Sequence, residues 1–207
     1  IWPISYREVF NLNSICFMDI LASHLQDVLV ISPKRIEDNR GWFMEAFRVG
    51  ALEKAIGNNL NFCQENQTMS KYGVLRGLHY QLPPYAQSKL VTVLSGKVLD
   101  VIVDVREGSP TFGGHTSIIL SGENQKMIFI PRGFAHGCIC LSKKALFSYK
   151  VDNYYNKQAE GSIAYNDPNL NIDWGIDEKE IIVSDKDKNN PLLDDAKCFK
   201  YKDSLYA

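Results

Sequence analysis

A histidine and a lysine stand ten positions apart in one strand-rich stretch of this sequence. The segment Gly77-Leu78-His79-Tyr80-Gln81 is followed by Lys89. A neutral imidazole can remove a proton from a carbon beside a carbonyl, and a nearby ammonium can stabilise the charge that develops on the carbonyl oxygen. The pair therefore suggests proton abstraction next to a ketone. A histidine among apolar residues can equally be a hydrogen-bonded core residue, so the interpretation depends on its neighbours.

Three further clusters could contribute to such a site. Arg40 stands beside a predicted turn and two aromatic residues, which suits a charged and stacking contact with a nucleotide. His136 follows a second turn, and the phenol of Tyr149 could serve as an acid near a carbanion. Arg76 lies three residues before His79, so in a regular strand the two side chains would point to opposite faces. A shared site requires that Gly77 bend or bulge the chain.

Other reaction classes find less support. The sequence has no G-x-S-x-G elbow, no phosphate-binding loop and no dinucleotide fingerprint. A metal is the main competitor, because histidines often hold metals in small β-barrels. His79 has no H-x-H partner, and His24 and His115 lie outside the clusters, so we expect no metal and no other cofactor.

Composition narrows the classes of partner. The 207 residues include 23 basic and 24 acidic side chains, for a formal net charge of −1, with 45% apolar residues. This balance favours one globular domain, predicted over residues 18–207, and provides no net field for nucleic acid or an anionic membrane. An anionic ligand would have to be held by local cations.

The five cysteines include no C-x-x-C pair, which favours reduced thiols and a cytoplasmic location. Cys138 and Cys140 alternate with apolar residues and are predicted to share one buried sheet face. No run approaches the ~20 apolar residues of a membrane span, and no secretion signal is recognised. Residues 1–17 are interpreted as an extension of doubtful structural importance, with Met18 as a possible start.

Short β-rich runs separated by turn residues must position these side chains. Leu90–Leu94, the turn Ser95-Gly96 and Val98–Val105 are predicted to form a hairpin, and Leu52–Ile56 a short helix ended by Gly57. Further strands are predicted at Val28–Ile31, Trp42–Arg48, Thr116–Leu120, Lys126–Ile130, Gly137–Leu141 and Ala145–Val151. The pattern predicts an all-β antiparallel jelly roll, a cupin-like barrel or sandwich with a few short helices and room for a small ligand.

From about residue 27 to 192, the chain resembles the dTDP-4-dehydrorhamnose 3,5-epimerase family of metal-free cupins. The match is carried by RGWFME at 40–45, QEN at 64–66, GVLRGLHYQ at 73–81, SPTFG at 109–113 and PRGFAHG at 131–137. Shorter matches lie at 149–150, 154–155, 166–168 and 184–187. The match is therefore spread over most of the chain.

The resemblance implies that His79 is the general base, Tyr149 the opposing acid and Lys89 the group that stabilises the enolate oxygen. It also implies an aspartate that steadies His79, with Asp187 as the first choice and Asp167 as the second. The nucleotide-sugar site would be lined by Arg40, Glu45, Gln64, Asn66, Arg76, His136, Tyr155 and Lys186. The resemblance also implies a homodimer that acts without metal or nicotinamide. The expected pathway is the one that makes dTDP-rhamnose for cell-surface polysaccharide.

Three departures from the family pattern leave the substrate open. Ser88 stands where a glycine is usual, Tyr165 replaces a usual tryptophan and Gly175 a usual proline. The sugar could be of the rhamnose type, another deoxysugar or a heptose, carried on thymidine or another base, and one or two carbons could be inverted. A cupin-like module that binds a sugar nucleotide without converting it is the rival hypothesis, and its lack of need for both an acid and a base counts against it.

Overall fold

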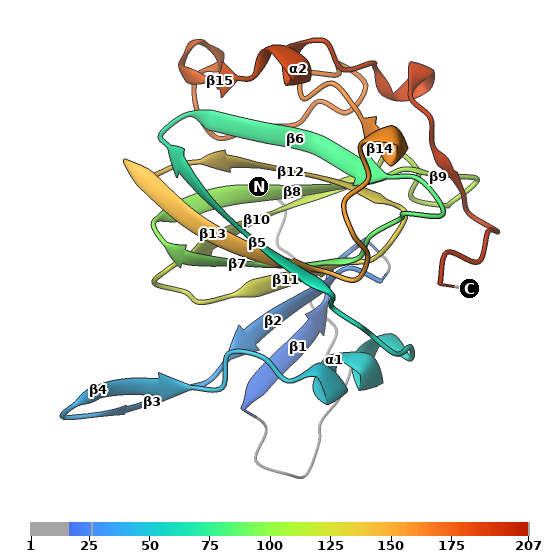
Figure 1. Ribbon diagram of the computed structural model, residues 1–207. Helices are drawn as coiled ribbons and strands as arrows, with labels where there is room; N and C mark the ends of the chain where they lie inside the picture. The colour runs from blue at the N-terminus through green and yellow to red at the C-terminus, as the bar shows by residue number, and fades with distance from the viewer. Residues whose placement is uncertain (1–16, 26, 207) are drawn as a thin grey trace.

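Two six-stranded sheets pack face to face and carry most of the strands (Figure 1). The computed structural model describes residues 17–25 and 27–206, so the predicted N-terminal extension lies almost wholly outside the described residues. Within the two sheets the pairings are antiparallel, apart from one short strand at the edge of the second. The prediction of an all-β antiparallel jelly roll is confirmed.

The two sheets are called the first and the second sheet, and each is defined by the order of its strands. The first sheet runs β1 (Met18–Ala22), β2 (Leu29–Pro33), β11 (Met127–Ile130), β7 (Lys89–Ser95), β13 (Lys144–Val151) and β5 (Gln64–Lys71). The second sheet runs β10 (His115–Ser121), β8 (Lys97–Asp104), β12 (Phe134–Cys140), β6 (Val74–Gln81) and β14 (Glu160–Ser162), with β15 (Ile182–Val183) parallel to β6.

The remaining elements are short. Two small ribbons pair β3 (Arg35–Asp38) with β4 (Gly41–Met44) and β9 (Arg106–Glu107) with β16 (Phe199–Lys200). The helices are α1 (Val49–Ile56) and α2 (Asp185–Lys188), with single 3-10 turns at Lys157–Ala159, Glu178–Glu180 and Leu193–Asp195.

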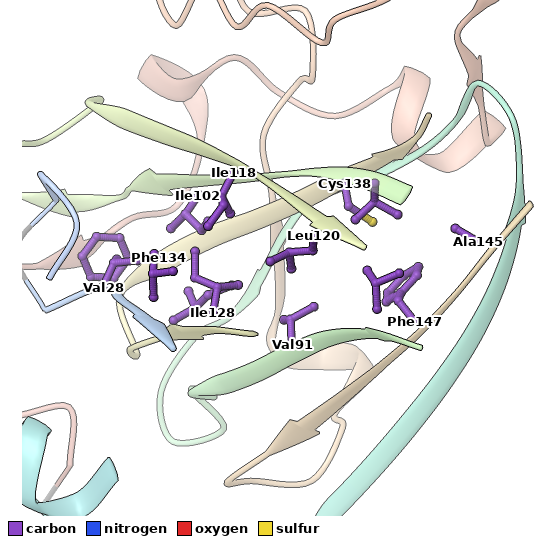
Figure 2. Packing of buried hydrophobic residues seen from close by; sticks show 14 of the residues in the cluster. Val28, Val91, Ile102, Ile118, Leu120, Ile128, Phe134, Cys138, Ala145 and Phe147 are labelled. Atoms are coloured by element: carbon purple, nitrogen blue, oxygen red, sulfur yellow. The ribbon is translucent and has the colours of Figure 1, made fainter. Parts of the chain in front are cut away.

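Alternating side chains along the strands build the core. On β8, Val98 and Ile102 point between the sheets, whereas Val101 and Val103 point to the outer face of the second sheet. The two cysteines that were predicted to share a buried face both lie in this inner layer: Cys138, labelled in Figure 2, and Cys140. Free thiols here act as small apolar groups that fill the space between the sheets.

Parts of both outer faces are covered, so several central strands are apolar on both sides. The segment that follows β14 lies over the second sheet (Figure 1), and Ile163, Trp174 and Leu193 pack against it. Helix α1 covers part of the first sheet through Leu52. It begins three residues before the predicted Leu52 and ends as predicted at Gly57, whose left-handed φ of +72° closes the helix. The predicted strand Trp42–Arg48 is shorter, since β4 ends at Met44.

The predicted hairpin of β7 and β8 is wrong. The two strands are consecutive in the chain, but β7 pairs with β11 and β13 in the first sheet and β8 with β10 and β12 in the second. The tight turn at Gly96 carries the chain from one sheet to the other, and a side chain there would meet the Lys144 carbonyl. Val91 of β7 and Val98 of β8 therefore belong to different sheets and both point into the core between them.

Strand β6 has one extra residue relative to β12, and this bulge explains how the side chains of Arg76 and His79 can reach one site. His79 pairs with His136 and Arg76 with Cys138, so β6 advances by three residues while β12 advances by two. Gly77 lies inside this bulge with a φ of +124°, and a Cβ there would lie 2.5 Å from the Cα of Gly137. The bulge brings Arg76 and His79 to the same side of the sheet.

The β3–β4 ribbon projects away from the sheets as a separate arm (Figure 1). It carries large apolar side chains that are more than half exposed: Ile36 at 54%, Trp42 at 51% and Phe43 at 64%. Ile36 and Phe43 are cross-strand partners on one face of the ribbon, whereas Trp42 lies on the other face, under the Arg35 guanidinium.

Candidate active site

A cavity of about 470 Å³ opens between the two sheets. The second sheet contributes Arg76, His79 and His136, and the first sheet contributes Lys89 and Tyr149. Lys186 and Asp187, from helix α2, complete the rim. Six residues selected from the sequence and the predicted aspartate partner of His79 thus line one pocket.

His79 is held by a buried carboxylate. Its Nε2 lies 2.6 Å from Oδ1 of Asp187, whose side chain is 5% exposed. Burial alone would raise the pKa of Asp187, but hydrogen bonds from His79 and from the Gly77 N–H outweigh it and hold the pKa below its usual value. An ionised Asp187 can only accept, so Nε2 carries the proton and Nδ1 is left as the basic nitrogen.

Helix α2 places Asp187 by a local capping interaction. Ser184 precedes the helix, and its Oγ accepts a hydrogen bond from the Asp187 N–H at 3.1 Å. The second choice from the sequence, Asp167, serves elsewhere. Its carboxylate accepts from the backbone N–H groups of Asn169 and Leu193, where it ties a loop to the C-terminal region. Asp187 is therefore the residue that contacts His79.

Lys89 begins β7, and its Nζ donates a hydrogen bond to the His79 carbonyl at 3.2 Å. Burial lowers the pKa of Lys89 to about 8, although the charge of Asp100 opposes the shift. Its ammonium is therefore close to the histidine, poorly hydrated and able to meet a developing negative charge.

We expect the alkaline limb of the pH–rate profile to report Lys89. The ammonium form would be present below the pKa of about 8 and lost as the pH rises through it, so kcat/KM should fall above about pH 8. In Lys89→Arg the cation persists far above this range. A lower rate without an alkaline limb near 8 is the expected result for that variant, and an unchanged limb would assign it to another group.

Tyr149 faces His79 from the opposite sheet. It lies on β13, stacks on Phe147 with ring centroids 6.2 Å apart, and is paired in register with Asn66 on β5. Burial raises the pKa of the Tyr149 hydroxyl, against a weaker lowering by Arg76 and by a hydrogen bond with Asn66. The phenol therefore keeps its proton at neutral pH, as a proton donor requires.

A second histidine–aspartate pair lies beside the first. His136 Nε2 is 2.8 Å from Oδ2 of Asp100, and Asp100 is completely buried. Its other oxygen, Oδ1, has no hydrogen-bond partner within the described residues. We did not select Asp100 from the sequence. The available signal was a single carboxylate inside the apolar strand Val98–Val103, a costly placement that usually indicates a partner or a function.

A family model with the description dTDP-4-dehydrorhamnose 3,5-epimerase matches residues 22–195. The chain belongs to this family. It is accordingly an isomerase that acts as a nucleotide-sugar epimerase.

Three relatives show how similar this epimerase is to known proteins. A dTDP-4-dehydrorhamnose 3,5-epimerase of Shigella flexneri is 46% identical over 182 residues, 88% of this chain and 99% of the relative. The crystal structure of a dTDP-6-deoxy-D-glucose-3,5-epimerase of Legionella pneumophila, with dTDP-4-keto-L-rhamnose, shows 44% identity, a TM-score of 0.85 and coverage of 90% and 100% of the two chains. A 3'-monoepimerase of Streptomyces bikiniensis, with dTDP-quinovose, shows 34% identity, a TM-score of 0.76 and coverage of 81% and 84%.

The other expected contacts of the epimerase lie on or next to strands β5, β6 and β14 and helix α2. Arg76 donates to the Ser70 hydroxyl at 3.1 Å, and Lys186 pairs with Glu160 at 2.7 Å. Tyr155 also hydrogen bonds to Glu160, which brings it beside Lys186. On β5, Gln64 donates to Asn66 at 2.8 Å, and both share the strand face of Thr68, a pocket-lining residue. Arg76 and Lys186 line the cavity itself, whereas Gln64, Asn66 and Tyr155 lie outside its lining and reach it through these neighbours.

Two selected residues lie away from the pocket of their own chain. Arg40 is at the tip of the arm, 85% exposed and ion-paired with Asp38. Glu45 follows the arm and is paired with Arg48 at 2.6 Å. Neither lines the cavity. The contacts with the nucleotide sugar that the resemblance implies for Arg40 and Glu45 are therefore not explained by the pocket of a single chain.

The SPTFG match of this epimerase has a structural explanation. Ser109 and Thr111 donate hydroxyl hydrogen bonds to Oδ2 of the buried Asp104, which also binds Arg106. The motif therefore satisfies a buried carboxylate rather than contacting the pocket. Over residues 17–25 and 27–206, no helix is long and apolar enough to cross a membrane. In the same ranges, no three His, Cys, Asp or Glu residues are grouped to hold a metal ion.

Proposed function

We propose that this epimerase inverts C3 and C5 of a dTDP-4-dehydro-6-deoxyglucose-type sugar, with His79 as base, Tyr149 as acid and Lys89 as the enolate stabiliser. The observation that carries the proposal is the placement of His79 and Tyr149 on opposite sheets of one cavity, with Lys89 next to His79. A binding module would need no such opposed pair.

The chemistry follows from the acidity of hydrogens beside the 4-ketone. His79 removes one of them, and the electron pair moves onto the ketone oxygen, where the Lys89 ammonium stabilises it. Tyr149 then delivers its proton from the opposite sheet, so the configuration inverts and no redox change occurs. A preorganised contact such as that of Lys89 can lower the barrier by about 3 to 4 kcal/mol.

The choice of substrate is supported by the comparisons. The 3,5-epimerases of Shigella flexneri and Legionella pneumophila are 46% and 44% identical to this chain, against 34% for the 3'-monoepimerase. The Legionella pneumophila protein binds dTDP-4-keto-L-rhamnose. These relatives favour thymidine and two inverted carbons over a heptose nucleotide or a single inversion.

Deuterium wash-in tests the proposal directly. In heavy water, purified protein should place deuterium at both C3 and C5 of dTDP-4-dehydro-6-deoxyglucose and invert both centres, as followed by NMR. The rate should be unchanged after treatment with a chelator, since the groups proposed to act are side chains of the protein. Exchange at C3 alone would assign a monoepimerase, and no exchange in protein shown to bind the sugar would favour the binding module.

We also propose a homodimer in which the arm of one copy reaches the pocket of the other. The arm exposes Trp42 and Phe43 and carries Arg40, which the resemblance assigns to the nucleotide site but which lies outside its own cavity. A second copy would cover the apolar side chains and supply the missing cation. A cytoplasmic location is supported by the free thiols of Cys63, Cys138, Cys140 and Cys198.

Mixing two impaired variants tests this arrangement. Arg40→Ala and His79→Asn copies, dissociated and reassociated together, should recover activity, because each mixed dimer holds one pocket with both native groups. Random pairing would restore about one quarter of the pockets. Activity no higher than the sum of the separate variants would place Arg40 in its own pocket, and a monomeric mass by light scattering would exclude the dimer.

A further inference from the structure

The C-terminal segment 197–206, called here the C-terminal strap, lies beyond the family match, which ends at residue 195. It is nevertheless fixed at separate points along its length. The Lys197 carbonyl accepts a hydrogen bond from the Tyr80 hydroxyl at 2.6 Å, and Phe199 is buried against the Tyr80 ring. Strand β16 then pairs with β9. Tyr80 directly follows the proposed base, His79.

The end of the strap contacts the residue that precedes Lys89. Tyr206 and Ser88 share a hydrogen bond between their hydroxyls at 2.8 Å, and Ser88 is completely buried. The Tyr206 oxygen also accepts from the Arg132 N–H at 3.1 Å, and the Arg132 guanidinium lies over the Tyr206 ring. The last turn of the strap is therefore bound by both hydroxyl and ring.

The same network holds Ser88 from its backbone side. Asp152 accepts from the Ser88 N–H at 2.6 Å and from Nε of Arg132 at 3.2 Å. Arg132 in turn donates to the Leu205 carbonyl at 2.7 Å. The strap, Arg132 and Asp152 form a closed set of contacts around one residue, directly beside the start of β7.

We propose that the C-terminal strap positions Lys89, with Tyr206 as the positioning residue that acts through Ser88. This inference rests on the proposed function of Lys89. The lysine side chain bridges from β7 to the His79 carbonyl across the pocket, so a small shift of the β7 start would move its ammonium relative to the enolate oxygen. Reaction rates are sensitive to misplacements of this kind. The strap contacts no pocket-lining residue through Tyr206, so substrate affinity should be untouched.

Tyr206→Phe is the informative variant, because it keeps the ring on Arg132 and removes only the shared hydroxyl. We expect kcat for inversion to fall about 3- to 10-fold while KM stays within about 2-fold of wild type. Tyr201→Phe is the matched control. Tyr201 is also in the strap, is 39% exposed like Tyr206, and stacks its ring on an arginine, Arg106. The Tyr201 hydroxyl has no hydrogen-bond partner among residues that the structure describes. The kcat of Tyr201→Phe should therefore match that of wild type.

A double-variant cycle separates positioning from general loosening. Ser88→Ala should also lower kcat, and the double variant should lose less than the product of the two single effects, because both changes break the hydrogen bond between Ser88 and Tyr206, although Tyr206→Phe also removes the acceptor of the Arg132 N–H. Equal kcat values for Tyr206→Phe and Tyr201→Phe would overturn the proposal, as would two effects that multiply. Wild-type protein without exchange would instead refute the proposed function, so the two failures are distinguishable.

Discussion

His79→Asn should lower the rate of deuterium wash-in and of inversion about 10³-fold or more. A positioned general base contributes about 10² to 10⁴ in rate, and asparagine keeps a polar side chain but has no basic nitrogen. Because Asp187 is buried and bound to His79, the native imidazole has one orientation and one basic nitrogen. The measurement is NMR of C3 and C5 in heavy water under single-turnover conditions.

Two controls make this result specific. The affinity of the variant for dTDP, measured by calorimetry, should stay within about 3-fold of wild type, since the base is not proposed to hold the nucleotide. His24→Asn changes an exposed histidine that contacts the His115 carbonyl, outside the pocket, and should leave the rate unchanged. A His79→Asn rate within tenfold of wild type would remove the imidazole from the proposed mechanism.

Tyr149→Phe should separate proton exchange from inversion. If Tyr149 is the acid, as proposed, then in its absence His79 can still take a proton and return one to the same face, so deuterium should enter with the original configuration retained. Inversion should fall about 10²- to 10⁴-fold, the range for loss of a positioned acid. Phenylalanine keeps the stacking on Phe147, so the pocket wall is preserved. The ratio of exchanged to inverted sugar, measured by NMR, is the deciding quantity.

The matched control for this variant is Tyr154→Phe, which changes a tyrosine that is 64% exposed. It should leave both exchange and inversion at the wild-type rate. Equal losses of exchange and inversion in Tyr149→Phe would show that the phenol supports the pocket rather than delivering a proton. Near-normal inversion would transfer the role of acid to another group.

The sequence predicted the strands better than their pairing. Period-two alternation is a local signal, and it correctly indicated the runs that became β7, β8 and β10. Pairing is non-local, so a turn at Gly96 between two valine-rich runs resembled a hairpin when it was in fact a crossing between sheets. The information that decides between these outcomes lies in β11 and β12, far along the chain.

The residues of the site also differ in how far the sequence alone could predict them. His79 and Lys89 could be selected from residue chemistry, but Asp187 came from the resemblance, since nothing local connects it to a histidine on β6. Asp100 was missed because one carboxylate in an apolar strand has no motif of its own. The position of Arg40 outside its own pocket depends on how the arm projects, which no local pattern encodes.

The hydrogen bond between His79 and Asp187 joins residues 108 positions apart in the chain. During synthesis the histidine emerges long before its carboxylate, and all of β6 to β15 lies between or beside them. The imidazole that we propose as the base therefore acquires this orientation only when helix α2 lies against β6. A chain in which α2 has not yet been made or docked should therefore show no exchange activity. In a refolding time course, the appearance of exchange activity would mark the docking of α2.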